Sequence, residues 1–134
     1  MNNYVMCSGG FDPLHVGHLR LFKAASHFGL VLVVLNSDAW LMRKKGEVCW
    51  SIADRWELLL GLRSVSLVVD VEDVDDTVCA AIHRWHPRYF ANGGDRTPDN
   101  SSSAEVALCQ QLGIELLWNV GGTKVRSSQE LCRR

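Results

Sequence analysis

The run Leu30–Leu35 limits the possible folds of this chain more than any other feature. It reads Leu-Val-Leu-Val-Val-Leu, with no polar position and several β-branched residues. The run is far too short to cross a bilayer. A strand that is apolar on both faces is typical of a parallel sheet covered by helices on each side. This run therefore predicts an α/β fold.

Strand and helix signals alternate along the rest of the chain. Strands are predicted at 4–7, 30–35, 66–71, 88–91 and 114–118, and helices at 17–27, 51–62, 75–85, 104–112 and from 127. This order predicts a single-domain, doubly wound parallel sheet of Rossmann-like type over residues 1–134. Such sheets bind ligands at the carboxyl ends of their strands. The loops expected to carry a site are therefore 8–16, 36–50, 92–103 and 119–126.

Composition excludes several other classes of protein. The 134 residues are 47% apolar, which suits one folded domain, and the net charge of −1 argues against a general nucleic-acid binder. The five cysteines are widely spaced and form no C-x-x-C pair, so neither a disulfide framework nor a structural zinc site is expected. With no signal-peptide pattern at the N-terminus, we expect a cytoplasmic protein with reduced thiols and no membrane contact.

A glycine-rich segment follows the first predicted strand and opens the first predicted helix. It reads Gly9-Gly10-Phe11-Asp12-Pro13-Leu14-His15-Val16-Gly17-His18. The leading glycines let the backbone pass close to a ligand, and the free N–H groups of a helix N-terminus bind anions. If the helix begins near Val16, both imidazoles point back toward that anion site. The small Gly17 would then leave room for a nucleotide against the backbone.

His15 and His18 suit nucleotidyl transfer. Attack on the α-phosphorus of an NTP builds charge on its equatorial and bridging oxygens, and N–H donors or cations in fixed positions stabilise that charge. Two other interpretations fit the residues alone. The histidines could only cap or pack the helix, or they could be a metal pair, although no third ligand of zinc type lies nearby.

The segment resembles the signature of the cytidylyltransferase-like nucleotidyltransferases, G-x-F-D-x-x-H-x-G-H. Every fixed position is matched here, by Gly9, Phe11, Asp12, His15, Gly17 and His18. The resemblance implies that His15 and His18 are catalytic, that Asp12 meets both substrates, and that further nucleotide contacts come from Gly9, Gly10, Phe11 and Gly17. Class I aminoacyl-tRNA synthetases share the H-x-G-H element, but this chain is too short for their tRNA-reading parts.

The basic stretch Arg43-Lys44-Lys45-Gly46 follows the second predicted strand. It is similar to the K-R-x-K-G pattern of heptose-phosphate adenylyltransferase domains, and glycerol-3-phosphate cytidylyltransferases have a comparable lysine pair. Met42 stands where that pattern has its first lysine. The resemblance implies that Lys44 and Lys45 are catalytic. Adjacent side chains in an extended loop point opposite ways, so one of the two is expected to face the α-phosphate. A solvated basic loop is the alternative.

Two further residues are expected to contact the second substrate. Arg55 lies in the first turn of a predicted helix, where a cation opposes the helix dipole and so needs another reason to be present. The resembled family has an E-R or H-R pair here, which implies that Arg55 holds an anionic substrate group. A surface ion pair is the alternative. Trp40, beside the basic stretch, is expected to line the substrate pocket; a core position is the alternative.

The last two strand-end loops complete the predicted nucleotide site. Asn92-Gly93-Gly94-Asp95 is similar to the family's G-G-D segment, which implies that Gly94 and Asp95 meet the base and ribose; a plain turn is the alternative. The segment Gly121–Ser128 joins glycines, cations and hydroxyls before a helix, which suits a polyphosphate cradle. Gly121 stands where the family has an arginine. The cradle contacts are expected from Lys124, Arg126, Ser127 and Ser128.

The resemblance implies an enzyme that transfers a nucleoside monophosphate from an NTP to a sugar or polyol phosphate and releases pyrophosphate. ATP is favoured over CTP, because the N-S-D and G-G-D segments look more like those of the heptose enzymes. Mg²⁺ is expected as cofactor on the NTP phosphates, with no metal site in the protein itself, and the family implies a homodimer. The alternatives are an adenylyltransferase for nicotinate mononucleotide or pantetheine phosphate, and a nucleotide-binding pseudoenzyme.

Overall fold

A parallel sheet forms the centre of the molecule. The computed structural model describes residues 2–71, 75–94, 97 and 102–122. The described strands are β1 (Tyr4–Gly9), β2 (Leu30–Leu35), β3 (Leu67–Asp70), β4 (Tyr89–Ala91) and β5 (Glu115–Leu117). The described helices are α1 (Val16–Ala25), α2 (Asp38–Lys45), α3 (Ile52–Leu60), α4 (Cys79–Trp85) and α5 (Ser103–Leu112). This arrangement confirms the predicted doubly wound, Rossmann-like α/β fold.

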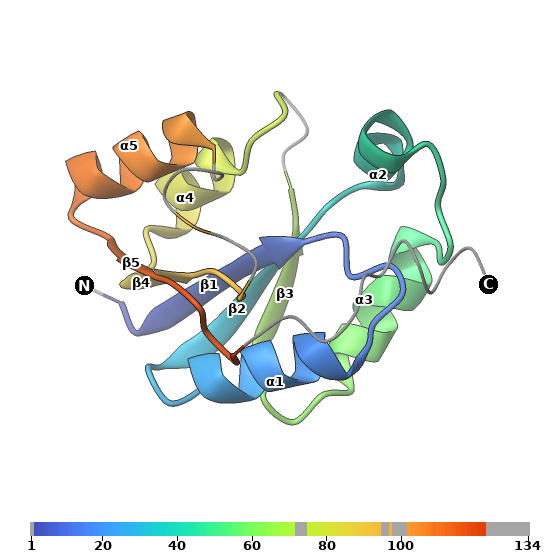
Figure 1. The fold of residues 1–134 in the computed structure, drawn as a ribbon, viewed down its shortest axis with the longest axis horizontal. Coiled ribbons are helices and arrows are strands. Elements are labelled where there is room, and N and C mark those ends of the chain that lie inside the picture. The colour runs from blue at the N-terminus through green and yellow to red at the C-terminus, as the bar shows by residue number, and fades with distance from the viewer. Residues whose placement is uncertain (1, 72–74, 95–96, 98–101, 123–134) are drawn as a thin grey trace.

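The strand order places a binding crevice beside the central strand. Across the sheet the order is β3-β2-β1-β4-β5, with every pairing parallel. The chain first runs outward from β1 through β2 to β3, and then returns to build β4 on the other side of β1 (Figure 1). The strand order reverses at β1, which is where sheets of this type bind ligands.

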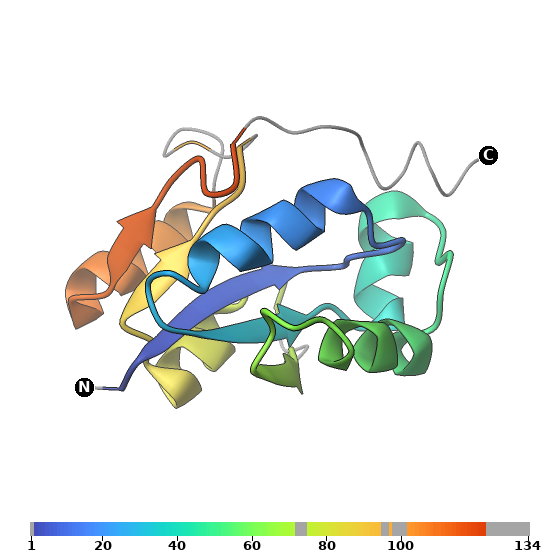
Figure 2. The same ribbon diagram turned by 90° about the horizontal axis from the view of Figure 1, so that it is seen from below.

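Helices cover both faces of the sheet, as the run Leu30–Leu35 predicts. Figures 1 and 2 show α1 and α3 on one face and α4 and α5 on the other. In β2, Val31 and Val33 pack with the first pair of helices, whereas Leu32 and Val34 pack with the second pair. All four side chains are fully buried, so each successive residue of the strand contributes to one of two cores. No helix in the described ranges has the length and apolar character that a membrane span requires.

Two secondary-structure predictions are wrong. The expected loop at 36–50 contains the helix α2, which begins at a Ser37 cap and ends at Gly46 with a φ of 78°. The helix predicted from Asp75 begins only at Cys79. Asp75 instead accepts hydrogen bonds from the Thr77 backbone N–H and hydroxyl, at 2.8 and 2.7 Å, and these bonds lower the pKa of its carboxyl. The turn that they form competes with the helix for those backbone groups.

Candidate nucleotidyltransferase site

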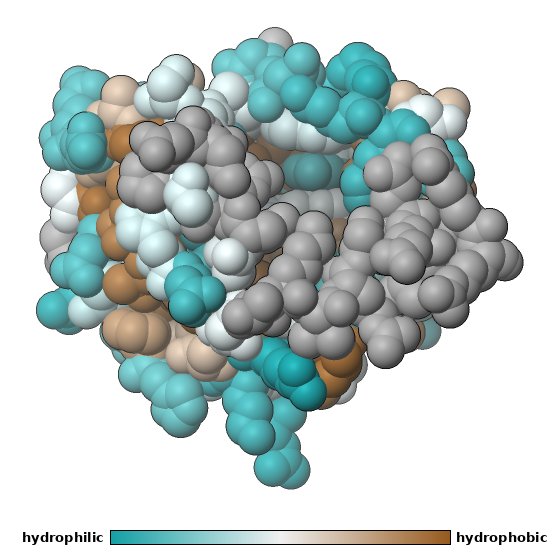
Figure 3. Space-filling model, in the orientation of Figure 1, coloured by the Kyte–Doolittle hydropathy of each residue, from teal (hydrophilic) through white to brown (hydrophobic). Residues whose placement is uncertain are grey.

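A pocket of about 590 Å³ opens at the carboxyl ends of β1, β2 and β4. Figure 3 shows the surface hollowed in this region, with hydrophilic residues above the opening. Ten of the predicted site residues line the pocket: Gly9, Gly10, Phe11, His15, Gly17, His18, Trp40, Lys44, Lys45 and Gly94. The structure thus brings together residues from the glycine-rich segment, α2 and the loop after β4. The volume of the pocket is in the range of small-molecule binding sites.

The histidine pair builds the N-terminus of α1. His15 is the N-cap, and its Nδ1 accepts a hydrogen bond from the Gly17 N–H at 3.0 Å. Nδ1 of His18 accepts a hydrogen bond from the His15 N–H at 3.3 Å, which completes a reciprocal capping box. The two rings stack with their centroids 3.9 Å apart. Capping and pocket lining, which the sequence presents as alternatives, therefore occur in the same two residues.

The capping box also defines the donor that each ring presents. A nitrogen that accepts a hydrogen bond carries no proton, so each neutral imidazole must hold its proton on Nε2. The N–H groups of His15 and Gly17 are bonded to ring nitrogens, and the His18 N–H bonds the His15 carbonyl at 3.1 Å. Three of the backbone N–H groups at the start of α1 are thus bonded inside the protein. Both rings belong to residues that line the pocket.

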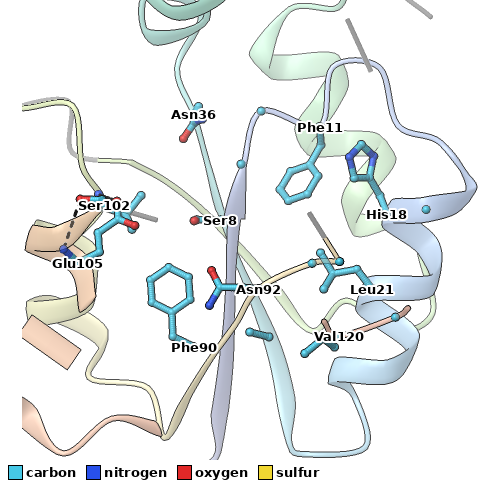
Figure 4. Close-up of a pocket in the computed structure, with 18 of the residues that line it drawn as sticks. Ser8, Phe11, His18, Leu21, Asn36, Phe90, Asn92, Ser102, Glu105 and Val120 are labelled. Carbon is cyan, nitrogen blue, oxygen red and sulfur yellow. Dashed lines mark hydrogen bonds between the residues drawn. The ribbon is translucent and has the colours of Figure 1, made fainter. Parts of the chain in front are cut away.

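Gly17 and Phe11 hold the two rings in place. A Cβ at Gly17 would lie 2.8 Å from Cε1 of His15, so the missing side chain makes room for this imidazole. Phe11 is buried and lies edge-on to His18, with the ring centroids 4.9 Å apart. It packs equally against Phe22 of α1. Figure 4 shows the Phe11 and His18 rings side by side at the rim of the pocket.

Lys44 and Lys45 form the C-terminal end of α2, not an extended loop. Both line the pocket. Nζ of Lys44 lies 3.9 Å from the Asp76 carboxylate, which also lies 3.4 Å from Arg43. For Lys45 no ion pair is found within the described part of the chain. The two lysines therefore differ in charge environment because of a residue from the loop before α4.

Arg55 requires a correction. Its side chain has 0% exposure and does not line the pocket. This differs both from the predicted contact with a substrate anion and from the alternative, an ion pair at the surface. Its guanidinium donates to the carbonyls of Trp50, Gly10 and Asn36 at 2.9, 3.0 and 2.7 Å, and to the Asp38 carboxylate at 2.6 Å. All of these partners are groups of the protein.

Asp12 is likewise turned inward. It is buried, and its two carboxylate oxygens accept hydrogen bonds from the backbone N–H groups of Cys49 and Trp50, both at 2.6 Å. It does not line the pocket, in contrast to the predicted substrate contacts. The carboxylate instead fastens the loop between α2 and α3 to the glycine-rich segment.

Comparison with known proteins agrees with this geometry. The family model described as cytidylyltransferase-like matches residues 6–119. This chain belongs to the cytidylyltransferase-like family. A relative from Geotalea uraniireducens (strain Rf4), named bifunctional protein HldE, is 36% identical over 132 residues, which cover 96% of this chain and 26% of the relative. A relative of the same name from Nitrosococcus oceani is 35% identical over 97% of this chain and 28% of its own length. The chain thus spans about a quarter of the length of these curated relatives.

Solved structures show the same fold. A lipopolysaccharide core biosynthesis protein from Thermoplasma volcanium GSS1 aligns with a TM-score of 0.69 at 24% identity, covering 86% of this chain and 92% of that one. A putative nicotinate-nucleotide adenylyltransferase from Vibrio parahaemolyticus aligns with a TM-score of 0.58 at 20% identity, covering 99% of this chain and 86% of that one. These structures show the shared fold, and it is the family match that places this chain among nucleotidyltransferase enzymes.

Gly121 departs from the cytidylyltransferase-like pattern for a structural reason. Its φ is 85°, and a Cβ there would lie 2.8 Å from the backbone nitrogen of Leu21 in α1. The arginine of the family pattern therefore does not fit here. Gly94 packs against Gly122, which joins the ends of β4 and β5 beside the pocket. The remaining predicted contacts, Asp95, Lys124, Arg126, Ser127 and Ser128, lie outside the described residues.

Several pocket residues were not predicted from the sequence. Ser8, Asn36 and Asn92 are polar residues at or just after the ends of β1, β2 and β4, and that position is a signal that could have identified them. Figure 4 shows them between Ser102 and Glu105 on one side and Phe11 and His18 on the other. Asp76 and Glu105 come from the loop before α4 and from α5, and no local pattern marks them.

The described residues hold no group of three or more His, Cys, Asp or Glu side chains suited to a metal ion. A Mg²⁺ ion that arrives on the phosphates of an NTP would not need such a group, because Mg²⁺ keeps water and phosphate ligands rather than a full protein cage. Cys7 lies in β1 with no exposure, and burial raises the pKa of its thiol to about 12. Burial, with a smaller effect of Glu105, raises the pKa of Cys109 to about 11. Neither thiol is a nucleophile at neutral pH.

Proposed function

We propose that this chain transfers a nucleoside monophosphate from an NTP, ATP in preference to CTP, to a phosphorylated sugar or polyol and releases pyrophosphate. The observation that carries the proposal is the position of the histidine pair. His15 and His18 line a pocket that also holds the glycine turn and Lys45, and their Nδ1 capping bonds leave the ring proton of each neutral imidazole on Nε2. These are the groups that an in-line displacement at phosphorus needs.

The transfer does not require a strong general base. An oxygen of the acceptor phosphate attacks the α-phosphorus, the bond from that phosphorus to the oxygen bridging to the β-phosphate breaks, and pyrophosphate leaves with the electron pair. The attacking phosphate is already largely ionised near neutral pH. The residues of this chain bind and orient the two substrates, so catalysis consists of positioning and charge stabilisation.

Each part of the pocket has a proposed role in this reaction. The Nε2–H groups of His15 and His18 donate to the α-phosphate oxygens, and Lys45 stabilises the negative charge of the transition state. Mg²⁺ bound with the NTP neutralises phosphate charge. Lys124, Arg126, Ser127 and Ser128 remain the predicted contacts to the β- and γ-phosphates. Because Arg55 and Asp12 face the protein interior, the acceptor phosphate is left to the cations of α2.

Pyrophosphate release tests the proposal directly. The chain is incubated with each of the four NTPs and Mg²⁺, together with a panel of sugar phosphates, polyol phosphates, nicotinate mononucleotide and pantetheine phosphate. The proposal expects release with ATP and a sugar or polyol phosphate. Release only with one of the two cofactor precursors would replace the proposed acceptor. Nucleotide binding without release for any pair would favour a pseudoenzyme.

Two substitutions at His18 separate the donor role from the capping role. His18→Ala removes the imidazole and its cap, and is expected to reduce kcat by about 10²–10³-fold. His18→Glu keeps an acceptor for the His15 N–H, since glutamate at this position serves a capping box, but an ionised carboxylate has no hydrogen to donate. We expect His18→Glu to retain the stability of the native chain in urea denaturation while remaining strongly impaired. Full activity in His18→Glu would show that the ring only caps the helix.

A further inference from the structure

The fully buried arginine Arg55 is the least expected polar feature of the molecule. An isolated charge in the interior is costly, and it is tolerated when the group is paired and its hydrogen bonds are satisfied. Arg55 meets both conditions, with a 2.6 Å contact to the Asp38 carboxylate and hydrogen bonds to three backbone carbonyls. Its donors are directed to several acceptors at once, as a planar guanidinium permits.

The four acceptors belong to four segments that meet beside the pocket. Gly10 lies in the glycine turn, Asn36 at the end of β2, Asp38 in the first turn of α2, and Trp50 in the loop before α3. Three of these acceptors are distant along the chain, since Gly10, Asn36 and Asp38 lie 45, 19 and 17 residues from Arg55; Trp50 lies five residues away. One side chain therefore fixes the distance between the glycine turn and the start of α2.

Besides this anchor, helix α2 is held by two buried side chains and by the exposed contacts of Arg43 and Lys44 with Asp76. Its two buried side chains are Trp40 and Leu41. Leu41 packs against the glycine turn so closely that a Cβ at Gly10 would lie 2.6 Å from its Cδ2. At the far end of the helix, Lys44 and Lys45 line the pocket. A small rotation of α2 about its N-terminus would move these ammonium groups relative to the histidines.

We propose that Arg55 is a positioning residue for nucleotidyl transfer, acting through Asp38 to place α2, and with it Lys45, against the glycine turn. The inference rests on the proposed function, but it assigns Arg55 no contact with either substrate. Positioning errors far from the reacting atoms lower rates steeply, since a displacement of about 1 Å costs up to about 10²-fold.

Asp38→Asn tests the proposal better than a change of Arg55 itself. Loss of the buried arginine would leave carbonyls without donors and could unfold the chain. Asp38 has 44% side-chain exposure, so its substitution by asparagine preserves shape and removes only the charge facing Arg55. The matched control is Asp54→Asn. Asp54 is also an acidic residue in the first turn of a helix, so both variants lose the same favourable interaction with the helix dipole.

The kinetic prediction is a loss in kcat that depends on Lys45. Asp38→Asn is expected to lower kcat about tenfold to a hundredfold with KM for the NTP changed less than about threefold, and Asp54→Asn to leave both near the native values. In a Lys45→Ala background the effect of Asp38→Asn should fall to about twofold or less, because there is no longer an ammonium to position. Equal effects of the two asparagine variants, or losses that simply multiply with Lys45→Ala, would overturn the proposal.

Hydrogen exchange gives a second readout that does not require activity. The amides of α2 should exchange about tenfold faster in Asp38→Asn than in the native chain or in Asp54→Asn, while the amides of α1 stay unchanged. Unaltered exchange in α2 would contradict the anchoring role. A native chain that transfers no nucleotide would refute the proposed function, and this exchange comparison would still decide whether Arg55 and Asp38 hold α2.

Discussion

Lys44 and Lys45 are neighbours in sequence but differ in electrostatic environment. Lys44 lies near Asp76, whereas the described residues give Lys45 no such partner. The contact of Lys44 is long and exposed, so it lowers the free charge in the pocket without fixing the side chain firmly. The ammonium of Lys45 is therefore the stronger candidate for the α-phosphate.

Alanine substitutions distinguish the two lysines. We expect Lys45→Ala to reduce kcat about 10²–10³-fold, as for loss of a preorganised transition-state donor, and Lys44→Ala to reduce it less than about tenfold. Steady-state kinetics with saturating ATP and acceptor measure both. Equal, small losses would show that this end of α2 is only a solvated basic surface.

Gly17→Ala is predicted to act through His15. The new methyl group would overlap the imidazole, which must then leave the Gly17 N–H that it caps. Loss of an N-cap costs about 0.5–2 kcal/mol of stability, and the displaced donor should lower kcat by about tenfold or more. Urea denaturation and kinetics measure the two effects. Unchanged kcat would mean that the position of His15 is not critical.

At the scale of elements, Glu105 joins α5 to the start of α4. Val78 precedes α4 and supplies no side-chain cap, but its backbone N–H donates to the Glu105 carboxylate at 3.1 Å. Ser102, the N-cap of α5, accepts from the Glu105 N–H and so sets the orientation of this turn. The two helices thus meet at one carboxylate beside the pocket, as Figure 4 shows for Ser102 and Glu105.

Removing that carboxylate should loosen both helices. Glu105→Ala is expected to lower the free energy of unfolding by about 1.5–3 kcal/mol, the range for a hydrogen bond to a charged group. The control is Glu57→Ala in α3, where an exposed side chain should change the free energy by less than about 0.5 kcal/mol. Urea denaturation of both variants provides the comparison. Similar values for the two would show that the Glu105 contact does not contribute to stability.

At the scale of the whole molecule, stability depends on the helices that cover both faces of the sheet. Leu30 and Leu32 point to the same face of β2, yet Leu30 has 50% exposure and Leu32 has none. Leu32→Ala is expected to cost about 2–5 kcal/mol of unfolding free energy, because it leaves a cavity under α4 and α5. Leu30→Ala at the uncovered end should cost well under half as much. Equal losses in chemical denaturation would contradict the two-sided burial of the strand.

Local patterns of the sequence determined the fold and the edge of the sheet that carries the site. Three of these patterns are an uninterrupted apolar strand, apolar residues at helical spacing, and helix-capping residues. Each depends only on residues close together in the sequence, so it can be recognised without knowing which segments pack against it. The glycine-rich segment likewise placed the histidines at the start of α1. Helix α2 has the local signals of a helix in Ser37, the basic last turn and Gly46. It was not predicted because its apolar stripe is too short to show a helical period.

Only the tertiary structure decided where the polar side chains of the site point. Arg55 and Asp12 have sequence contexts that suit substrate contacts, and both are instead satisfied by backbone groups from other segments. The pairing of Asp76 with α2 and the close approach of Gly121 to α1 are also contacts between segments that are distant in sequence. A buried charged group must be paired and hydrogen-bonded, and the tertiary structure determines which groups lie close enough to do this. Those partners are tens of residues away along the chain, so no local pattern records them.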